Sequence, residues 1–330
     1  MNGVNHSTIL GRAIALTLSL CAVASAQTPL RIGLSFDTGG KNDKSFNQAS
    51  WVGAQRAAKE FGVKISNFEP NESSQVGQGI RTFAKAGHDL VIGVGFANNG
   101  PIQDNAKTYP GQKFAVVDDL PKGANTTGLR FAEEQGSFLV GFIAGNSTST
   151  GVVGFVGGMD IPLIHKFEAG YRAGVLHVCP DCRVVAQYAG VTPEAFKNPT
   201  RGKELALTQY GSGVNVIFHA SGSTGLGVFE AARSTGKKAI GVDADQYGEA
   251  PGYVLTSMVK RVDEAVFDAV QLVQQGRFRG GVRVLGLKER GVDYVYDARN
   301  KALIPDAARA RVELLRDSII AGHIRVPSTR

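Results

Sequence analysis

The chain has 330 residues, of which 43% are hydrophobic and 20% are charged, and its formal net charge is +7. This balance excludes a disordered chain and predicts a well-packed protein with one large or two medium cores. The 36 Lys and Arg residues are scattered among 29 acidic residues and form no basic block, and such a pattern does not predict a nucleic-acid partner.

The first 26 residues are typical of a secretory signal peptide. The apolar run 13–26, AIALTLSLCAVASA, is shorter than the roughly 18 to 20 residues of a membrane-spanning helix, and it ends in a small-x-small cleavage site. The alternative is a lipoprotein signal cut before Cys21, but Leu20 is large where that cut requires a small residue. We therefore expect an exported protein, periplasmic or on the cell surface and possibly membrane-associated.

From residue 30 onward, apolar runs of strand length alternate with segments of helical spacing. In the first half we expect strands at 30–36, 63–68, 89–95 and 113–119, and helices at 45–62, 72–87 and 98–111. The alternation begins again at residue 151, with strands at 151–158, 183–190, 214–220 and 237–243 and helices at 162–178, 199–211 and 224–236.

The last part of the chain continues the pattern. A strand followed by a long helix is expected within 253–276, then strands at 282–287 and 292–297, and a terminal helix from 305 to about 321. A tail of this kind can return to the first half of the molecule and then to the second, which would make several chain crossings.

This order predicts an α/β protein with two doubly wound parallel-sheet lobes of about four strands each, joined by a hinge. We expect the N-terminal lobe to comprise 27–131 plus about 258–282. The C-terminal lobe would comprise 132–257 plus about 283–330.

Two cysteines remain once the signal peptide is removed, Cys179 and Cys182 in the sequence VCPDC. Neither further ligands at metal spacing nor a redox motif opening an early helix accompanies them. In an oxidising compartment a local disulfide is favoured over free thiols.

Candidate binding residues follow the expected strands, where open α/β sheets bind their ligands. Phe46 and Phe196 lie in loops beyond strand ends, so each ring needs a flat group to cover it, or else packs under its own lobe. Asp43, Asp118 and Asp243 offer hydrogen-bond acceptors, although a carboxylate at a strand end is often only a helix cap.

Two further polar side chains complete this set. Asn47 offers a donor and an acceptor, and Lys260 follows the strand LTSMV, where it would place one positive charge near the carboxylates. The alternative for Lys260 is an ordinary surface lysine.

Motifs of catalysis are missing from the sequence. No strand leads G-x-G-x-x-G into a helix, no G-x-x-x-x-G-K-[ST] or G-x-S-x-G is present, and the six histidines are isolated. We therefore expect no catalytic residues, no cofactor and no metal.

Five motifs carry a family resemblance: DKSFNQASWVGAQRA, GFVGGMDIPLIHKFEAGYRAGV, FHASGSTGLGVFEAA, AIGVDADQ and VLTSMVKRVDEAVFDA. In this order they resemble the basic membrane protein family of ABC transporter substrate-binding proteins, which includes purine nucleoside receptor lipoproteins. The resemblance runs from about residue 31 to about residue 276. It implies a type I periplasmic-binding-protein fold whose two lobes close on a nucleoside.

The resemblance also implies roles for the aromatic and base-end residues. Phe46 and Phe196 would stack on the two faces of the base. Asp43 and Asn47 would be the polar groups at the base end.

The remaining matched positions concern the sugar. Asp118 resembles a carboxylate that binds base or ribose, and Gly222 lets the backbone approach the ligand. Asp243 and Lys260 resemble the pair that holds the ribose hydroxyls.

The function so implied is capture of a purine nucleoside and delivery to an ABC transporter permease, by a monomer that performs no chemistry. The alternative is the same fold binding a nucleobase, a sugar or a signalling molecule. An enzyme of nucleoside metabolism is the third interpretation.

Overall fold

The computed structural model describes residues 1, 3 and 28–330. The expected signal peptide, including Cys21, falls on positions that lie almost entirely outside these described residues. No helix in the described part is long and apolar enough to cross a membrane.

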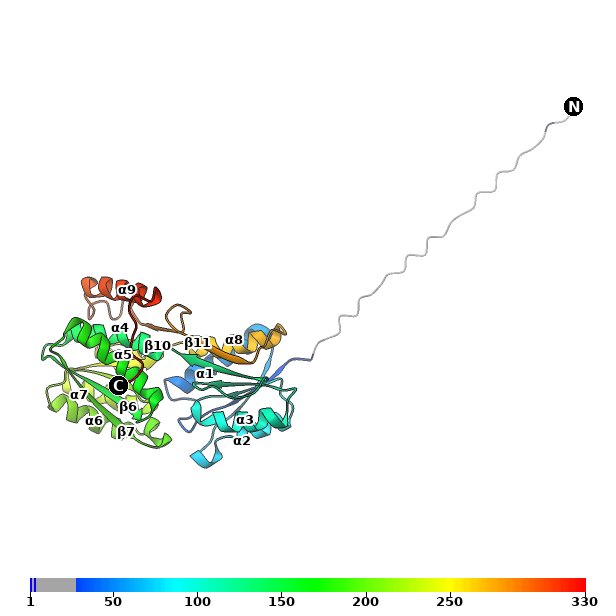
Figure 1. The fold of residues 1–330 in the computed structure, drawn as a ribbon, viewed down its shortest axis with the longest axis horizontal. Coiled ribbons are helices and arrows are strands. Elements are labelled where there is room, and N and C mark those ends of the chain that lie inside the picture. Colours follow the sequence, from blue (N-terminus) through cyan, green and yellow to red (C-terminus); the bar gives the residue numbers. More distant parts are fainter. Residues whose placement is uncertain (2, 4–27) are drawn as a thin grey trace.

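Two lobes stand side by side, each with its own six-stranded sheet (Figure 1). The first sheet is parallel throughout and has the order β11-β5-β4-β3-β1-β2. Its strands are β1 (Arg31–Ser35), β2 (Lys64–Phe68), β3 (Leu90–Gly93), β4 (Lys113–Val117), β5 (Thr126–Phe131) and β11 (Gly281–Leu285). Its helices are α1 (Phe46–Phe61), α2 (Gln78–Lys85), α3 (Asn99–Thr108) and α8 (Val262–Gln274).

The second sheet has the order β12-β10-β9-β8-β6-β7 and is parallel except for β12, which runs antiparallel to β10. Its strands are β6 (Val152–Met159), β7 (Arg183–Gly190), β8 (Val216–Ala220), β9 (Lys238–Asp243), β10 (Val254–Lys260) and β12 (Val292–Tyr294). Its helices are α4 (Glu133–Ser147), α5 (Pro162–Val178), α6 (Pro199–Gly211), α7 (Gly225–Thr235) and α9 (Asp306–Ile320).

The α/β class and the two doubly wound sheets are confirmed. Each sheet has six strands where we expected about four, because the tail adds β11 to the first sheet and β10 and β12 to the second, and an unassigned segment supplies β5. β10, in the second sheet, ends at Lys260, and β11, in the first sheet, ends at Leu285. The chain therefore passes between the lobes a few residues after the expected boundaries at 257 and about 282.

One expected helix is shorter than its sequence pattern. The segment 72–87 forms a 3₁₀ turn, η1 (Ser73–Gln75), and the α-helix begins only at Gln78. Gly77 separates the two with φ of 91°, a left-handed conformation that interrupts a helix.

The longest gap in the sequence interpretation, 120–150, contains β5 and α4. Most of α4 is buried, and α5 packs directly on it. A Cβ atom at Gly141 would lie 2.1 Å from the carbonyl oxygen of Tyr171, and one at Gly174 would lie 2.0 Å from that of Phe138. Glycine is therefore required for this helix contact.

The cysteines of VCPDC, at the end of α5, form a disulfide, with a Cα–Cα distance of 5.3 Å between Cys179 and Cys182.

Candidate functional site

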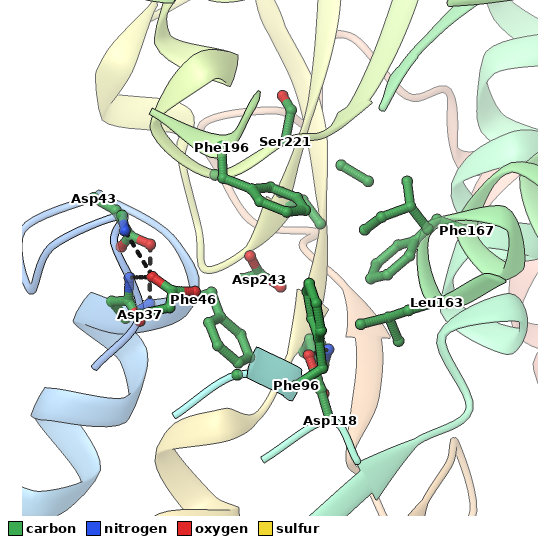
Figure 2. Close-up of a pocket in the computed structure, with 18 residues that line it drawn as sticks. Asp37, Asp43, Phe46, Phe96, Asp118, Leu163, Phe167, Phe196, Ser221 and Asp243 are labelled. Atoms are coloured by element: carbon green, nitrogen blue, oxygen red, sulfur yellow. Dashed lines mark hydrogen bonds and ion pairs between the residues drawn. The ribbon is translucent and has the colours of Figure 1, made fainter. Parts of the chain in front are cut away.

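A pocket lies where the carboxyl ends of both sheets meet (Figure 2), and its empty space, open solvent included, is about 580 Å³. The eight residues singled out from the sequence all line it: Asp43, Phe46, Asn47, Asp118, Phe196, Gly222, Asp243 and Lys260. Four come from the loop and helix after β1 or the end of β4, and four from the second sheet and its loops.

Phe46 and Phe196 project toward the centre of this pocket from opposite lobes (Figure 2). We expected both residues in loops, but each belongs to a helix. Phe46 is the first residue of α1, and Phe196 ends the 3₁₀ helix η3 (Pro193–Phe196). The close packing of Phe196 on Gly158, where a Cβ atom would lie 2.2 Å from the ring, holds that ring in place.

Two more phenyl rings line the pocket and were missed by sequence reasoning. Phe96 begins η2 (Phe96–Asn98) just after β3, and Phe167 lies in α5. Phe96 follows a strand end and could have been found by the same rule as Phe46. Phe167 lies inside a helix, where an apolar side chain ordinarily indicates core.

Asp43 serves as the cap of α1. Its carboxylate accepts hydrogen bonds from the backbone N–H groups of Ser45, Asn47 and Gln48 at 2.9 to 3.0 Å, which satisfies free donors of the helix N-terminus. Burial raises the pKa of Asp43 to about 7, although these three donors act in the opposite direction. The capping interpretation thus describes every hydrogen bond that Asp43 makes in the structure.

Asp37 is a second pocket carboxylate that the sequence interpretation overlooked. Its Oδ1 accepts from Asn47 Nδ2 at 2.7 Å and from the Gly39 N–H at 2.8 Å, while burial raises its pKa. The Asn47 side chain donates to Asp37 through Nδ2, and the other end of the same amide, Asn47 Oδ1, is a buried acceptor with no partner. This end of the pocket therefore requires hydrogen-bond donors from whatever occupies it.

Lys260 supplies the positive charge at the other end of the pocket. Its Nζ lies 2.6 Å from Asp118 Oδ2 and 3.1 Å from Glu133 Oε1, and 5.2 Å from the centre of the Phe46 ring. Lys260 is only 2% exposed, which corrects the alternative of a surface lysine. Burial alone would lower the pKa of Lys260, but the surrounding carboxylates, with Asp243 as the third, outweigh burial and raise it.

Two carboxylates at this end, those of Asp118 and Asp243, can each accept a further hydrogen bond. Burial raises the pKa of Asp118 to about 6, while Lys260 opposes that change. Asp118 Oδ1 is buried without a partner, and Asp243 Oδ2 accepts from Ser45 Oγ at 2.5 Å. Glu133, which the sequence interpretation missed, has its pKa lowered by Lys260 and Lys166 in spite of burial.

Backbone conformation also marks the pocket. Asp118 and Asp243 have φ of 71° and 65°, values that cost energy for residues with a side chain. Gly222 has φ of 56°, and a Cβ atom there would lie 2.9 Å from the carbonyl oxygen of Phe196. The second-lobe loop can pass this close to Phe196 because position 222 is glycine.

Ser221 and His219 lie 3.3 Å apart beside the pocket, but they do not form a catalytic pair. His219 is fully buried, and burial lowers its pKa to about 4. The other ring nitrogen of His219, Nε2, is hydrogen-bonded to the amide oxygen of Gln246 and not to a carboxylate. The imidazole therefore lacks the acidic partner that orients a catalytic histidine. Among the described residues, no group of His, Cys, Asp and Glu could hold a metal ion.

Comparisons with known proteins agree on one family. The family model described as "ABC transporter substrate-binding protein PnrA-like" matches residues 31–330. The CD4+ T-cell-stimulating antigen of Listeria monocytogenes is 36% identical over 90% of this chain and 87% of its own length. The ABC transporter nucleoside-binding protein BmpA of Lactococcus lactis is 33% identical over 92% of this chain and 90% of its own.

Among solved structures, an ABC transporter solute-binding protein from Aeropyrum pernix superposes with a TM-score of 0.84. It is 31% identical, and the match covers 92% of this chain and 94% of that one. The resemblance inferred from the five sequence motifs is thereby confirmed. The chain belongs to the family of PnrA-like ABC transporter substrate-binding proteins.

Proposed function

We propose that this substrate-binding protein captures a purine nucleoside between its two lobes and delivers it to the permease of an ABC importer. Members of the family bind their substrate without converting it, and they act outside the cytoplasm. The proposal rests mainly on one observation: Phe46 and Phe196, from opposite lobes, line a single pocket whose two ends carry buried polar groups.

Aromatic rings from both lobes suit a flat heterocycle. Phe46 and Phe196 would cover the two faces of the base, and each stacked face contributes about 1 to 3 kcal/mol in comparable base contacts. Phe96 and Phe167 would close the apolar wall around it. Since the stacking residues belong to different lobes, binding favours the closed arrangement.

Buried acceptors would select the ligand by its donors. Asn47 Oδ1, which is buried without a partner, and the carboxylate of Asp37 would receive N–H groups at the edge of the base. At the opposite end, Asp118 Oδ1 and Asp243 would receive ribose hydroxyls beside the ammonium of Lys260. A ligand without those hydroxyls would leave desolvated groups unpaired, which weakens binding.

The charge of the pocket supports an uncharged ligand. Four lining carboxylates, those of Asp37, Asp43, Asp118 and Asp243, face a single lining ammonium, that of Lys260. Two carboxylates already hold this ammonium. A nucleoside carries no charge at neutral pH and fits this surrounding better than an anion. The Lactococcus relative is named as a nucleoside-binding protein, which supports the same ligand class.

Calorimetric titration with guanosine, inosine, adenosine, adenine and ribose tests the proposal. We expect one nucleoside per chain, and at least tenfold weaker binding of adenine and of ribose. Phe46→Ala and Asp243→Ala should each weaken nucleoside binding at least tenfold without unfolding the protein. Val52→Ala, an exposed change on the same helix α1, is the control and should leave binding unchanged.

If only ribose or only a free base gave a heat of binding, that compound and not a nucleoside would be the ligand. Unchanged nucleoside binding in both pocket variants would show that the nucleoside binds elsewhere.

A further inference from the structure

The three chain crossings between the lobes lie toward one side of the two sheets. The chain passes from β5 to α4, from β10 to α8, and from β11 to β12, and these strands lie at or next to one edge of their sheets. The opposite edge strands are β2 in the first sheet and β7 in the second. In Figure 1, β7 and α2 lie on the side of the lobes away from β11 and α8.

The loops that follow these two far edge strands touch each other across the cleft. Ser73 Oγ in the first lobe donates to Glu194 Oε1 in the second at 3.0 Å. Lys197 Nζ donates to the carbonyl oxygen of Asn71 at 3.3 Å. None of these four residues lines the pocket, yet Glu194 and Lys197 flank Phe196, which does.

We propose that Asn71, Ser73, Glu194 and Lys197 form a rim latch that holds the lobes closed and slows ligand release. The part concerning the ligand rests on the proposed function. The latch itself is a property of the lobes and concerns their closure with or without a nucleoside.

The position of the rim latch gives it leverage. Four strand spacings of about 4.8 Å separate β2 from β5, and four separate β7 from β10, so the latch lies roughly 19 Å from the nearest crossings. A rotation of about 10° there would move the rim by roughly 3 Å, enough to break a hydrogen bond. The latch bonds therefore exist only when the lobes are fully closed.

Exposure sets the size of the effect. All four residues lie at or near the surface, where water competes for the same groups, so a single hydrogen bond changes an equilibrium by about three- to tenfold. The contacts within the pocket, such as Lys260 with Asp118, remain when the latch is removed. Loss of the latch should thus speed opening without abolishing binding.

The test compares Ser73→Ala with Ser74→Ala. Ser74 is the matched control, because its hydroxyl donates to Glu72 within its own loop and does not reach the other lobe. The first readout needs no ligand: the distance between spin labels at the exposed positions 85 and 207, one on each lobe, measured in the mature protein. We expect the ratio of closed to open molecules to fall three- to tenfold in Ser73→Ala relative to Ser74→Ala.

The second readout is the dissociation rate of guanosine, followed by the fluorescence of Trp51, the single tryptophan, which lies in α1 against Lys41. Ser73→Ala should raise that rate three- to tenfold and leave the association rate within twofold. Adding Glu194→Ala to Ser73→Ala should bring little further change, because both substitutions remove the same bond.

The outcomes separate the two proposals. If guanosine does not bind the wild type, the proposed function fails and the label distances alone judge the rim latch. If Ser73→Ala matches Ser74→Ala in label distances and in every rate that can be measured, the rim latch is wrong. A wild type with no closed population, with or without guanosine, overturns it as well.

Discussion

Carboxylates at strand ends do two different jobs in this pocket. Both carboxylate oxygens of Asp43 accept hydrogen bonds from backbone N–H groups at the start of α1, whereas Asp118 has a buried oxygen without a partner. The sequence alone does not separate these roles, since both residues follow a strand. The difference lies in the backbone: the chain after Asp43 turns at once into a helix whose N–H groups need an acceptor, while the chain after Asp118 continues as a loop.

The eight candidate residues could be predicted because one rule, the carboxyl ends of parallel strands, and one family resemblance point to the same positions. The rule also covers Asp37 and Phe96, which follow β1 and β3 closely. Phe167 and Glu133 could not be found this way. Each lies in a helix, and only the packing of the lobes turns it toward the pocket or toward Lys260.

Lys260 should be essential for stability as well as for binding. Lys260→Met removes the cation shared by Asp118 and Glu133, which leaves buried Asp118 without a cation and Glu133 with Lys166 alone. We expect the free energy of unfolding to fall by about 3 to 5 kcal/mol, measured by urea denaturation without ligand. Lys85→Met, the same change at an exposed position of α2, should alter it by less than about 0.5 kcal/mol. Equal effects of the two substitutions would mean that the buried carboxylates do not depend on Lys260.

At the scale of the elements, His219 couples β8 to α7. Its ring lies edge-on to Phe229 and against Gly225, where a Cβ atom would lie 2.0 Å from the ring. Burial lowers the pKa of His219 to about 4, below the value of about 6.5 in an unfolded chain. Between these two pH values the unfolded chain binds a proton that the folded protein cannot accept, so stability falls as the pH falls through this window.

The lowered pKa of His219 gives a prediction about how stability depends on pH. From pH 7 to pH 4.5, His219 should lower the free energy of unfolding by roughly 2 to 3 kcal/mol. Urea denaturation of the wild type and of His219→Gln at both pH values isolates this contribution, because the other titrating groups are common to both proteins. If the two proteins lose the same stability, His219 titrates normally in the folded state.

The contact between α4 and α5 makes a second prediction at this scale. Gly174→Ala forces a methyl group against the backbone of Phe138, and we expect a loss of about 1 to 3 kcal/mol in the free energy of unfolding. Gly211→Ala at the end of α6 places its methyl group in open space and should stabilise by up to about 1 kcal/mol. Thermal denaturation compares the two; a neutral Gly174→Ala would mean that the helices can separate at little cost.

The spacing of apolar residues predicted most strands and helices, because in an amphipathic element the apolar residues recur with the period of that element. It did not assign α4, whose residues are mostly buried and leave no polar face to set the period. It also extended α2 too far toward the N-terminus, since the pattern continues across Gly77 while the backbone does not.

At the scale of the whole molecule, the sequence predicts two lobes but not how they meet. Which strand lies at which edge follows from the winding of the chain, and only that order places β2 and β7 far from the crossings. The contact of Ser73 with Glu194, 121 residues apart, has no signal in either local sequence. Lys260 and Asp118 share a buried ion pair between the two lobes, and here the strand-end rule did predict that the lysine would lie near the carboxylates.

A structure of the mature protein crystallised with guanosine tests the central claim most directly. We expect the base between the rings of Phe46 and Phe196, donating to Asp37 or Asn47, with the ribose hydroxyls at Asp243 and Lys260. Density for the nucleoside outside the cleft, or a base that touches only one of the two rings, would contradict the account.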